Sequence, residues 1–144
     1  MIVLPVDTIV ENLKKHEGFR AHVYKCSAIP PAWTIGYGRN VDEDRGGLGI
    51  TEEEADYLLR NDVGRSVQEL RNNFKWFDES ESSVQSCLVE LCFWIGLTRL
   101  KRFRRMILAL AKQDRELASE ELQDSLLFKQ VPGRTQILAD RMRG

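Results

Sequence analysis

Three side chains near the start of the sequence have the types that acid–base chemistry uses. Glu17 stands directly before Gly18, the thiol of Cys26 follows nine positions later, and Thr34 lies eight positions beyond that. A carboxylic acid that keeps its proton can act as a general acid, as glycoside hydrolysis requires. A thiol beside Lys25 ionises more readily than a free one and can then serve as a nucleophile or base. The Thr34 hydroxyl both donates and accepts, so it can hold a water molecule.

Each of these residues also has a plainer interpretation when it is taken singly. Glu17 is then a surface glutamate at a helix end, Cys26 a small apolar side chain, and Thr34 an ordinary strand threonine. The arrangement of the three therefore matters more than any one of them.

Two elements must position these side chains. After a capping Asp7, apolar residues at helical spacing predict a helix over about residues 7–16, which Gly18 ends. The partial negative charge at that helix end would favour a protonated Glu17. Residues 19–50 alternate and contain glycines, which predicts a small antiparallel sheet with the segment DEDRGGLG as a hairpin turn.

The rest of the chain has helical periodicity. Thr51 and Glu54 form a capping box before a predicted long helix over about residues 51–72. An almost wholly apolar stretch at residues 84–95 predicts a central, buried helix. Further helices are expected at about 100–112, 114–124 and 132–143, the last starting with Pro132. The fold class is therefore α+β and mostly α.

Composition excludes several classes of protein. The 144 residues are 42% hydrophobic and 30% charged with net charge −1, which fits one soluble domain without the charge of a nucleic-acid binder. Cys26, Cys87 and Cys92 form no CxxC pair and have no zinc spacing with either histidine, so we expect no metal, no cofactor and no disulfide framework. The opening residues lack the pattern of a conventional signal peptide, and no stretch predicts membrane insertion.

The motifs resemble those of the phage-type lysozymes, the T-even-like endolysin muramidases of glycoside hydrolase family 24. Members carry Glu-Gly, a strand ending in Tyr-Lys and then Asp or Cys, and Thr-Ile-Gly-x-Gly. Here these motifs are Glu17-Gly18, Tyr24-Lys25-Cys26 and Thr34-Ile35-Gly36-Tyr37-Gly38. The similarity continues through ITEEEADYLLRNDV, FWIG at 93–96 and KQVPGRTQ at 129–136, so it spans nearly the whole chain.

The resemblance implies a single two-lobed domain over residues 1–144. A small β lobe (about 17–50) and a helical lobe (about 73–144, plus the helix at 7–16) would be joined by the long helix at 51–72. It further implies hydrolysis of the β-1,4 bond between N-acetylmuramic acid and N-acetylglucosamine in peptidoglycan. Glu17 would be the general acid, Cys26 would act on the opposite face of the sugar, and Thr34 would position the attacking water.

The sequence also departs from the family pattern. The segment SAIPPAW makes the Cys26–Thr34 interval two residues longer than usual, which would displace one of these side chains. Trp94 replaces a common Asn, and Arg39 stands where many members have His and would pair with Asp62. Cys26 is open to three interpretations: a thiolate base or nucleophile, a group that only helps to place water, or a bystander replaced by a carboxylate of Asp42, Glu43 or Asp44.

Other residues are candidates for substrate binding, with packing or solvation as the alternative role for each. They are Tyr37, Asn40, Phe93, Gln130 and Arg134. The expected biology is that of a monomeric endolysin that waits in the host cytoplasm and reaches peptidoglycan strands after a holin-type pore opens. Alternatives are a virion-borne wall-degrading enzyme, a lytic transglycosylase and a wall-binding relic without turnover. The basic stretch RLKRFRRM at 99–106 leaves a basic-helix binding protein as a further possibility.

Overall fold

The computed structural model describes residues 5–144 and confirms an α+β, mostly helical fold. Residues 1–4, part of the opening segment that lacks the pattern of a conventional signal peptide, lie outside the described residues. The chain divides into two compact units, the first ending at Asp56 and the second running Tyr57–Gly144. Each unit is therefore described by itself.

The first unit begins with helix α1 (Val6–Glu17). The helix starts at Val6, so the prediction of Asp7 as its N-cap is wrong, and among the described residues no side chain caps its first turn. Gly18 ends the helix with φ +71°, and its N–H donates to the Lys14 carbonyl at 3.0 Å. Because a positive φ suits glycine, this residue turns the chain away directly after Glu17.

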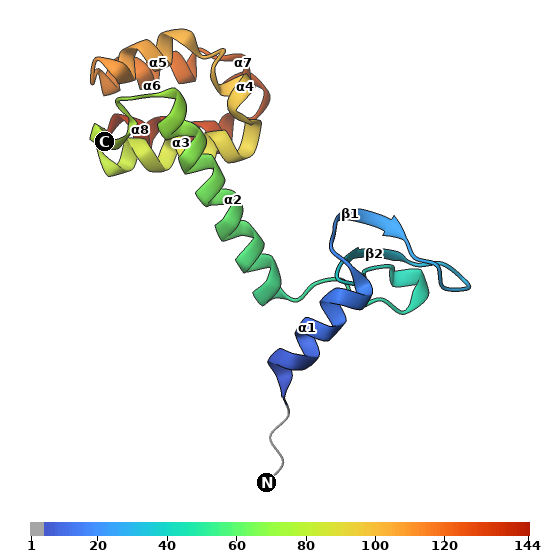
Figure 1. The fold of residues 1–144 in the computed structure, drawn as a ribbon. Coiled ribbons are helices and arrows are strands. Elements are labelled where there is room, and N and C mark those ends of the chain that lie inside the picture. Colours follow the sequence, from blue (N-terminus) through green and yellow to red (C-terminus); the bar gives the residue numbers. More distant parts are fainter. Residues whose placement is uncertain (1–4) are drawn as a thin grey trace. The chain divides into compact units, whose positions relative to one another are not determined.

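A three-stranded antiparallel sheet follows, in the order β1 (Arg20–Lys25), β2 (Trp33–Gly36), β3 (Arg39–Asn40). Figure 1 shows α1 running into β1, with β2 alongside. Thr34 lies opposite Tyr24 on one side and Asn40 on the other, so it occupies the middle strand. Pairing ends at Asn40, which corrects the sheet predicted to Ile50: the expected hairpin is the 3-10 turn η1 (Glu43–Arg45), capped by the Asp42 carboxylate.

The long helix α2 (Glu52–Asn73) starts as the capping box predicts. The Thr51 N–H donates to Glu54 Oε1 at 2.9 Å, and the Glu54 N–H donates to Thr51 Oγ1 at 3.1 Å. These two bonds satisfy backbone donors that a helix start otherwise leaves unpaired. The first residues of α2 belong to the first unit and the remainder to the second.

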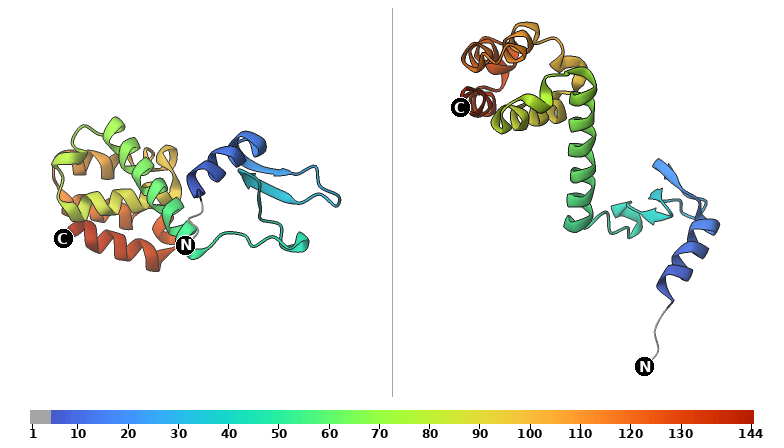
Figure 2. Two further views of the ribbon diagram at one scale, coloured as in Figure 1. Left: turned by 60° about the horizontal axis from the view of Figure 1, so that its bottom comes forward. Right: turned by 60° about the vertical axis from the view of Figure 1, so that its left-hand side comes forward.

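The second unit is helical and is built around α3 (Ser82–Ile95). Six α3 side chains are buried, which confirms the predicted central helix: Val84, Cys87, Leu88, Leu91, Cys92 and Ile95. Around it lie η2 (Phe77–Glu79), α4 (Leu97–Leu100), α5 (Arg104–Ala111), α6 (Arg115–Gln123), α7 (Leu126–Gln130) and α8 (Pro132–Arg143). Figure 2 shows these helices as one group, in which α8 contacts α3, α6 and α7.

Two details of this unit differ from the sequence prediction. The helix expected over 100–112 starts only at Arg104, as α5, because residues 101–103 form a turn after the short helix α4, and Phe103 in that turn is half-buried. The short helix α7, capped by the Ser125 hydroxyl, was not predicted. Within the described residues no helix combines the length and apolar character that a membrane span needs.

Candidate active site

Glu17, Cys26 and Thr34 line a single cavity of about 420 Å³ that lies wholly within the first unit. We call it the Glu17 cavity. Glu17 comes from the end of α1, Cys26 follows β1, and Thr34 projects from β2. A solvent-exposed carboxyl group thus shares a hollow with a half-buried thiol and a buried hydroxyl. The structure therefore brings together the three residues that the sequence singled out. The other lining residues are Tyr24, Ser27, Ala28, Pro30, Ala32, Gly38, Asn40 and Arg45.

The Glu17 side chain is placed by two glycines. Gly18 turns the chain at the end of α1, and Gly38, with φ +82°, lies directly against the Glu17 carboxylate. A side chain at position 38 would be strained by the backbone angle and would meet this carboxylate. The second glycine of the IGYG segment, Gly38, thus leaves room for an acid that comes from a different element.

The thiol of Cys26 belongs to a hydrogen-bond network centred on Ala32. The Cys26 N–H donates to the Ala32 carbonyl at 3.0 Å, and the Ala32 N–H donates to Cys26 Sγ at 3.3 Å. These bonds hold both ends of the intervening loop together. The Ala32 N–H, followed by that of Ala28, lowers the pKa of the Cys26 thiol below its ordinary value. Donors aimed at sulfur stabilise the thiolate, so they favour the reactive form.

The Thr34 hydroxyl connects the thiol to the sheet. Its side chain is buried, and Oγ1 donates to the Ala32 carbonyl at 2.9 Å. It also hydrogen-bonds Cys26 in a way that lowers the pKa of the thiol. A hydroxyl has one proton, so it can serve the carbonyl or the thiolate but not both at once. Its lone pairs remain available to accept a hydrogen bond from a bound water.

The long loop between Cys26 and Thr34 does not separate the two side chains. It runs outward, with Ile29 98% exposed, while Ser27, Ala28 and Pro30 line the Glu17 cavity. Despite the two extra residues, Cys26 and Thr34 line the same cavity. The extra length forms a wall of the cavity instead.

The carboxylates proposed as substitutes for Cys26 lie elsewhere. Asp42 accepts hydrogen bonds from the N–H of Trp33 at 3.1 Å and of Asp44 at 3.2 Å, and it lies 3.9 Å from Lys25 Nζ. This side chain holds the turn together. Neither Asp42 nor its neighbours Glu43 and Asp44 line the Glu17 cavity. The third interpretation of Cys26 thus finds no support in the geometry.

Of the two small-unit binding candidates, Asn40 reaches the Glu17 cavity and Tyr37 does not. Asn40 donates to the Arg45 carbonyl at 3.1 Å and accepts from the Asp42 N–H at 2.9 Å, so its amide is fixed. The Tyr37 ring lies against Phe19, 5.7 Å between centroids, with Lys14 Nζ 5.5 Å from it. Arg45 is a lining residue that sequence reasoning missed.

The expected partner of Arg39 is also corrected. Arg39 forms a two-pronged ion pair with Glu54, at 3.0 and 2.6 Å, and donates to the Gly49 carbonyl at 3.0 Å. Asp62, the predicted partner, pairs with Arg65 instead. The hydrogen bond from the Arg39 guanidinium is the largest of the contributions that lower the pKa of Glu54 to about 2. This pair ties β3 to the start of α2.

The remaining binding candidates belong to the second unit. Phe93 is 47% exposed and lines a cavity of about 610 Å³ with Ser66 and Glu69. Gln130 lines a different cavity, described below. The Arg134 guanidinium lies 3.9 Å from the centroid of the Trp94 ring, a cation–π contact.

Two of the three thiols are structural. Cys87 is buried and donates to the Leu138 carbonyl at 3.1 Å, and burial raises its pKa to about 11. Burial, followed by the charge of Glu69, raises the pKa of Cys92. Both thiols are therefore neutral core groups, as predicted. Within residues 5–144, no three His, Cys, Asp or Glu side chains gather as metal ligands.

Comparison with known proteins matches residues 14–141 to the family described as phage lysozyme. The endolysin of Bacillus phage B103 is 33% identical over 92 residues, which cover 64% of this chain and 34% of that protein. The pre-baseplate central spike protein Gp5 of Enterobacteria phage T4 is 26% identical over 155 aligned positions, covering 90% of this chain and 26% of that protein. The chain thus spans about a third or less of the length of these relatives.

Proposed function

Because the chain belongs to the phage lysozyme family, we propose that it hydrolyses the β-1,4 bond between N-acetylmuramic acid and N-acetylglucosamine in peptidoglycan. The observation that carries this proposal is the Glu17 cavity, where a carboxyl group, a thiol and a hydroxyl face one space. Hydrolysis of a glycoside needs an acid for the leaving oxygen and a group that activates water at the anomeric carbon.

In the proposed reaction Glu17 gives its proton to the glycosidic oxygen as the bond to the anomeric carbon breaks. Water adds to that carbon, and its proton passes to the Cys26 thiolate. Thr34 accepts a hydrogen bond from the water and so orients it. The lowered pKa of Cys26 supports a base role, since only the thiolate can take a proton. The alternative, in which Cys26 only places the water, uses the same contacts.

Five further residues are proposed to contact the glycan or its peptide. Asn40 would present its amide to a sugar from the wall of the Glu17 cavity, and Tyr37 would offer a phenol hydroxyl from the same unit. In the second unit Phe93 would stack on a sugar ring. Gln130 and Arg134 would hydrogen-bond the wall polymer, Arg134 through whichever N–H groups its stack on Trp94 leaves free.

The match to an endolysin supports a role in host cell lysis. The protein would then be a monomer that waits in the host cytoplasm and reaches the wall after a holin opens the membrane. The match to a phage spike protein favours a second candidate, a wall-degrading enzyme carried by the virion. Western blotting of purified virions separates the two, since only the second places the chain in the particle.

The test is digestion of purified sacculi by the wild type and Glu17→Gln, followed by mass spectrometry of the released muropeptides. The amide cannot donate a carboxylic proton, so turnover should fall by at least about a hundredfold. Glu11→Gln is the matched control, since Glu11 lies on the same helix, pairs with Lys14 on the surface and does not line the Glu17 cavity. Reducing ends identify a hydrolase, whereas 1,6-anhydro ends identify a lytic transglycosylase. Full activity in Glu17→Gln would show that Glu17 is not the general acid. If the wild type binds sacculi but releases no muropeptides, the protein is a wall-binding relic without turnover.

A further inference from the structure

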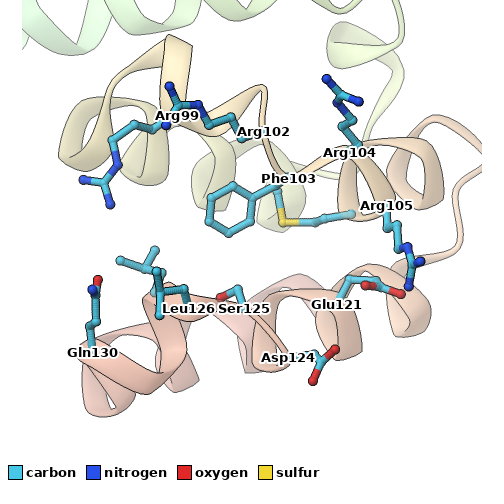
Figure 3. Close-up of a pocket in the computed structure, with 12 residues that line it drawn as sticks. Arg99, Arg102, Phe103, Arg104, Arg105, Glu121, Asp124, Ser125, Leu126 and Gln130 are labelled. Carbon is cyan, nitrogen blue, oxygen red and sulfur yellow. The ribbon is translucent and has the colours of Figure 1, made fainter.

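A second cavity lies within the helical unit, between the α4–α5 segment and the α6–α7 segment. Its volume is about 530 Å³. One wall carries Arg99, Arg102, Phe103, Arg104 and Arg105, as Figure 3 shows. The facing wall carries Glu121, Asp124, Ser125, Leu126, Leu127 and Gln130. We call it the arginine cavity; none of its lining residues belongs to the unit that holds Glu17.

The arginine wall concentrates positive charge in one segment of the chain. Residues 97–113 contain six lysines and arginines and no acidic residue, although the whole chain has net charge −1. Among the described residues, no carboxylate forms an ion pair with any of the four arginines, whereas Arg39, Arg65, Arg71 and Arg141 each have one. Like charges at helical spacing repel, so these arginines do not stabilise one another.

The backbone that bears these charges is firmly anchored. Leu100 and Met106 on either side are buried in the core, and Phe103 between them is half-buried. The guanidinium groups are therefore displayed from a fixed segment. Such preorganisation favours binding, because less freedom is lost when a ligand arrives.

The charges are not spread evenly around the cavity. Figure 3 shows Arg99 and Arg102 at one end, on the same side as Gln130, while Glu121 and Asp124 lie toward the other end. The carboxylates would repel an anion from their end. An anion is thus directed to the end formed by Arg99 and Arg102, where no acidic residue lines the cavity.

We propose that this end of the arginine cavity binds the phosphate group of a phosphate ester. Guanidinium forks match phosphate oxygens two at a time, and the Gln130 amide adds a further donor. Phe103, Leu126 and Leu127 supply apolar surface for the carbon part of the ester, which favours an ester over inorganic phosphate. The ester comes either from a soluble or polymer-borne phosphate or from a lipid headgroup. The site is separate from the Glu17 cavity and does not depend on the proposed hydrolase activity.

Isothermal titration calorimetry of the full chain with glycerol 3-phosphate tests the proposal, with glycerol as the uncharged control. The double variant Arg99→Gln/Arg102→Gln should weaken binding at least about tenfold, the loss expected for charge-assisted hydrogen bonds. Lys75→Gln/Lys112→Gln is the matched control: it removes the same charge from exposed positions outside the cavity and should leave the affinity unchanged. Thermal unfolding of all three proteins shows whether each is folded.

Vesicles of phosphatidylglycerol and, as a neutral control, phosphatidylcholine distinguish the sources. Binding of glycerol 3-phosphate and of the anionic vesicles assigns the site to a lipid headgroup, whereas binding of glycerol 3-phosphate alone assigns it to a soluble or polymer-borne ester. Binding to anionic vesicles without binding to glycerol 3-phosphate would overturn the cavity proposal. Equal losses of affinity for glycerol 3-phosphate in Arg99→Gln/Arg102→Gln and in Lys75→Gln/Lys112→Gln would overturn it too. Failure to bind any phosphate probe overturns it as well. None of these results bears on the sacculus digestion, so the two proposals fail independently.

Discussion

The carboxylate of Glu17 rests against Gly38, where a Cβ atom would come within 2.8 Å of Glu17 Oε2. No Cβ atom fits at that distance unless the carboxylate moves. The glycine at position 38 is thus part of what positions the acid, although it carries no functional group.

Gly38→Ala should therefore lower turnover of sacculi by about a hundredfold, the effect of displacing a catalytic group by about 1 Å. Gly36→Ala is the matched control, because Gly36 has a similar positive φ, +69°, but nothing within 4 Å of the added carbon. Both variants share the backbone strain, measured as a loss of thermal stability. Equal activity in the two variants would show that contact with Glu17 is irrelevant.

Replacement of Cys26 separates its two proposed roles. Cys26→Ser removes the ionisable group and should lower turnover about a hundredfold or more if the thiolate is a base. Cys26→Asp restores a fixed negative charge and should keep a measurable fraction of activity. Rates of muropeptide release from purified sacculi give the comparison. If the serine variant is as active as the wild type, Cys26 has no part in proton transfer and serves at most to place water.

The Arg39–Glu54 pair predicts an acid-sensitive contribution to stability. The pKa of Glu54 is about 2 in the folded protein against an ordinary value of 4.5, so folding favours its ionised form. This contribution is fully present above about pH 4.5 and is lost as the pH falls toward 2. The wild type should therefore exceed Glu54→Gln in stability most at pH 7 and by little at pH 2.

Urea unfolding followed by circular dichroism at several pH values measures that difference. Glu53→Gln provides the control, since Glu53 is an exposed neighbour in the first turn of α2 and Arg39 pairs with Glu54, not with it. A constant gap between the wild type and Glu54→Gln across the whole pH range would contradict the linkage.

The core of the helical unit depends on α3. Leu91 is fully buried there, and Leu91→Ala should lower the free energy of unfolding by about 2–5 kcal/mol, because it removes apolar contacts and leaves a cavity. Leu108→Ala, at a side chain that is 60% exposed, should cost less than about 1 kcal/mol. Chemical denaturation of both variants tests the difference. Similar losses of unfolding free energy in Leu91→Ala and Leu108→Ala would mean that α3 is not the central element of the core.

Much of the Glu17 cavity could be predicted from the sequence because its parts are local. Glu17 precedes a helix-ending glycine, Cys26 directly follows β1, and Thr34 lies on the neighbouring strand β2, and the alternation of both strands is visible in the sequence. Antiparallel pairing of adjacent strands then brings the two together. The capping box at Thr51 and Glu54 was predictable for the same reason, since its bonds span only three residues.

Features set by tertiary contacts could not be predicted in this way. Arg45 reaches the Glu17 cavity because a 3-10 turn folds residues 43–45 back, where alternation alone had suggested a hairpin. Arg39 pairs with Glu54 and not with Asp62. The Glu54 carboxylate also caps α2, where the Thr51 N–H holds it in place. The break between α4 and α5 lies within a continuous helical pattern, at a turn whose half-buried Phe103 packs against the core.

The unequal environments of the three thiols have a consequence for the protein under oxidative stress. Cys26 alone combines solvent access with a lowered pKa, the properties that make a thiol react with hydrogen peroxide, whereas Cys87 and Cys92 are buried. Peroxide should thus convert Cys26 selectively to a sulfenic acid, and a reducing agent such as dithiothreitol should reverse the change. A chain with aspartate at this position would have no such sensitivity. Cysteine in place of aspartate at position 26 therefore makes the oxidation state of the candidate site depend on the redox conditions around it.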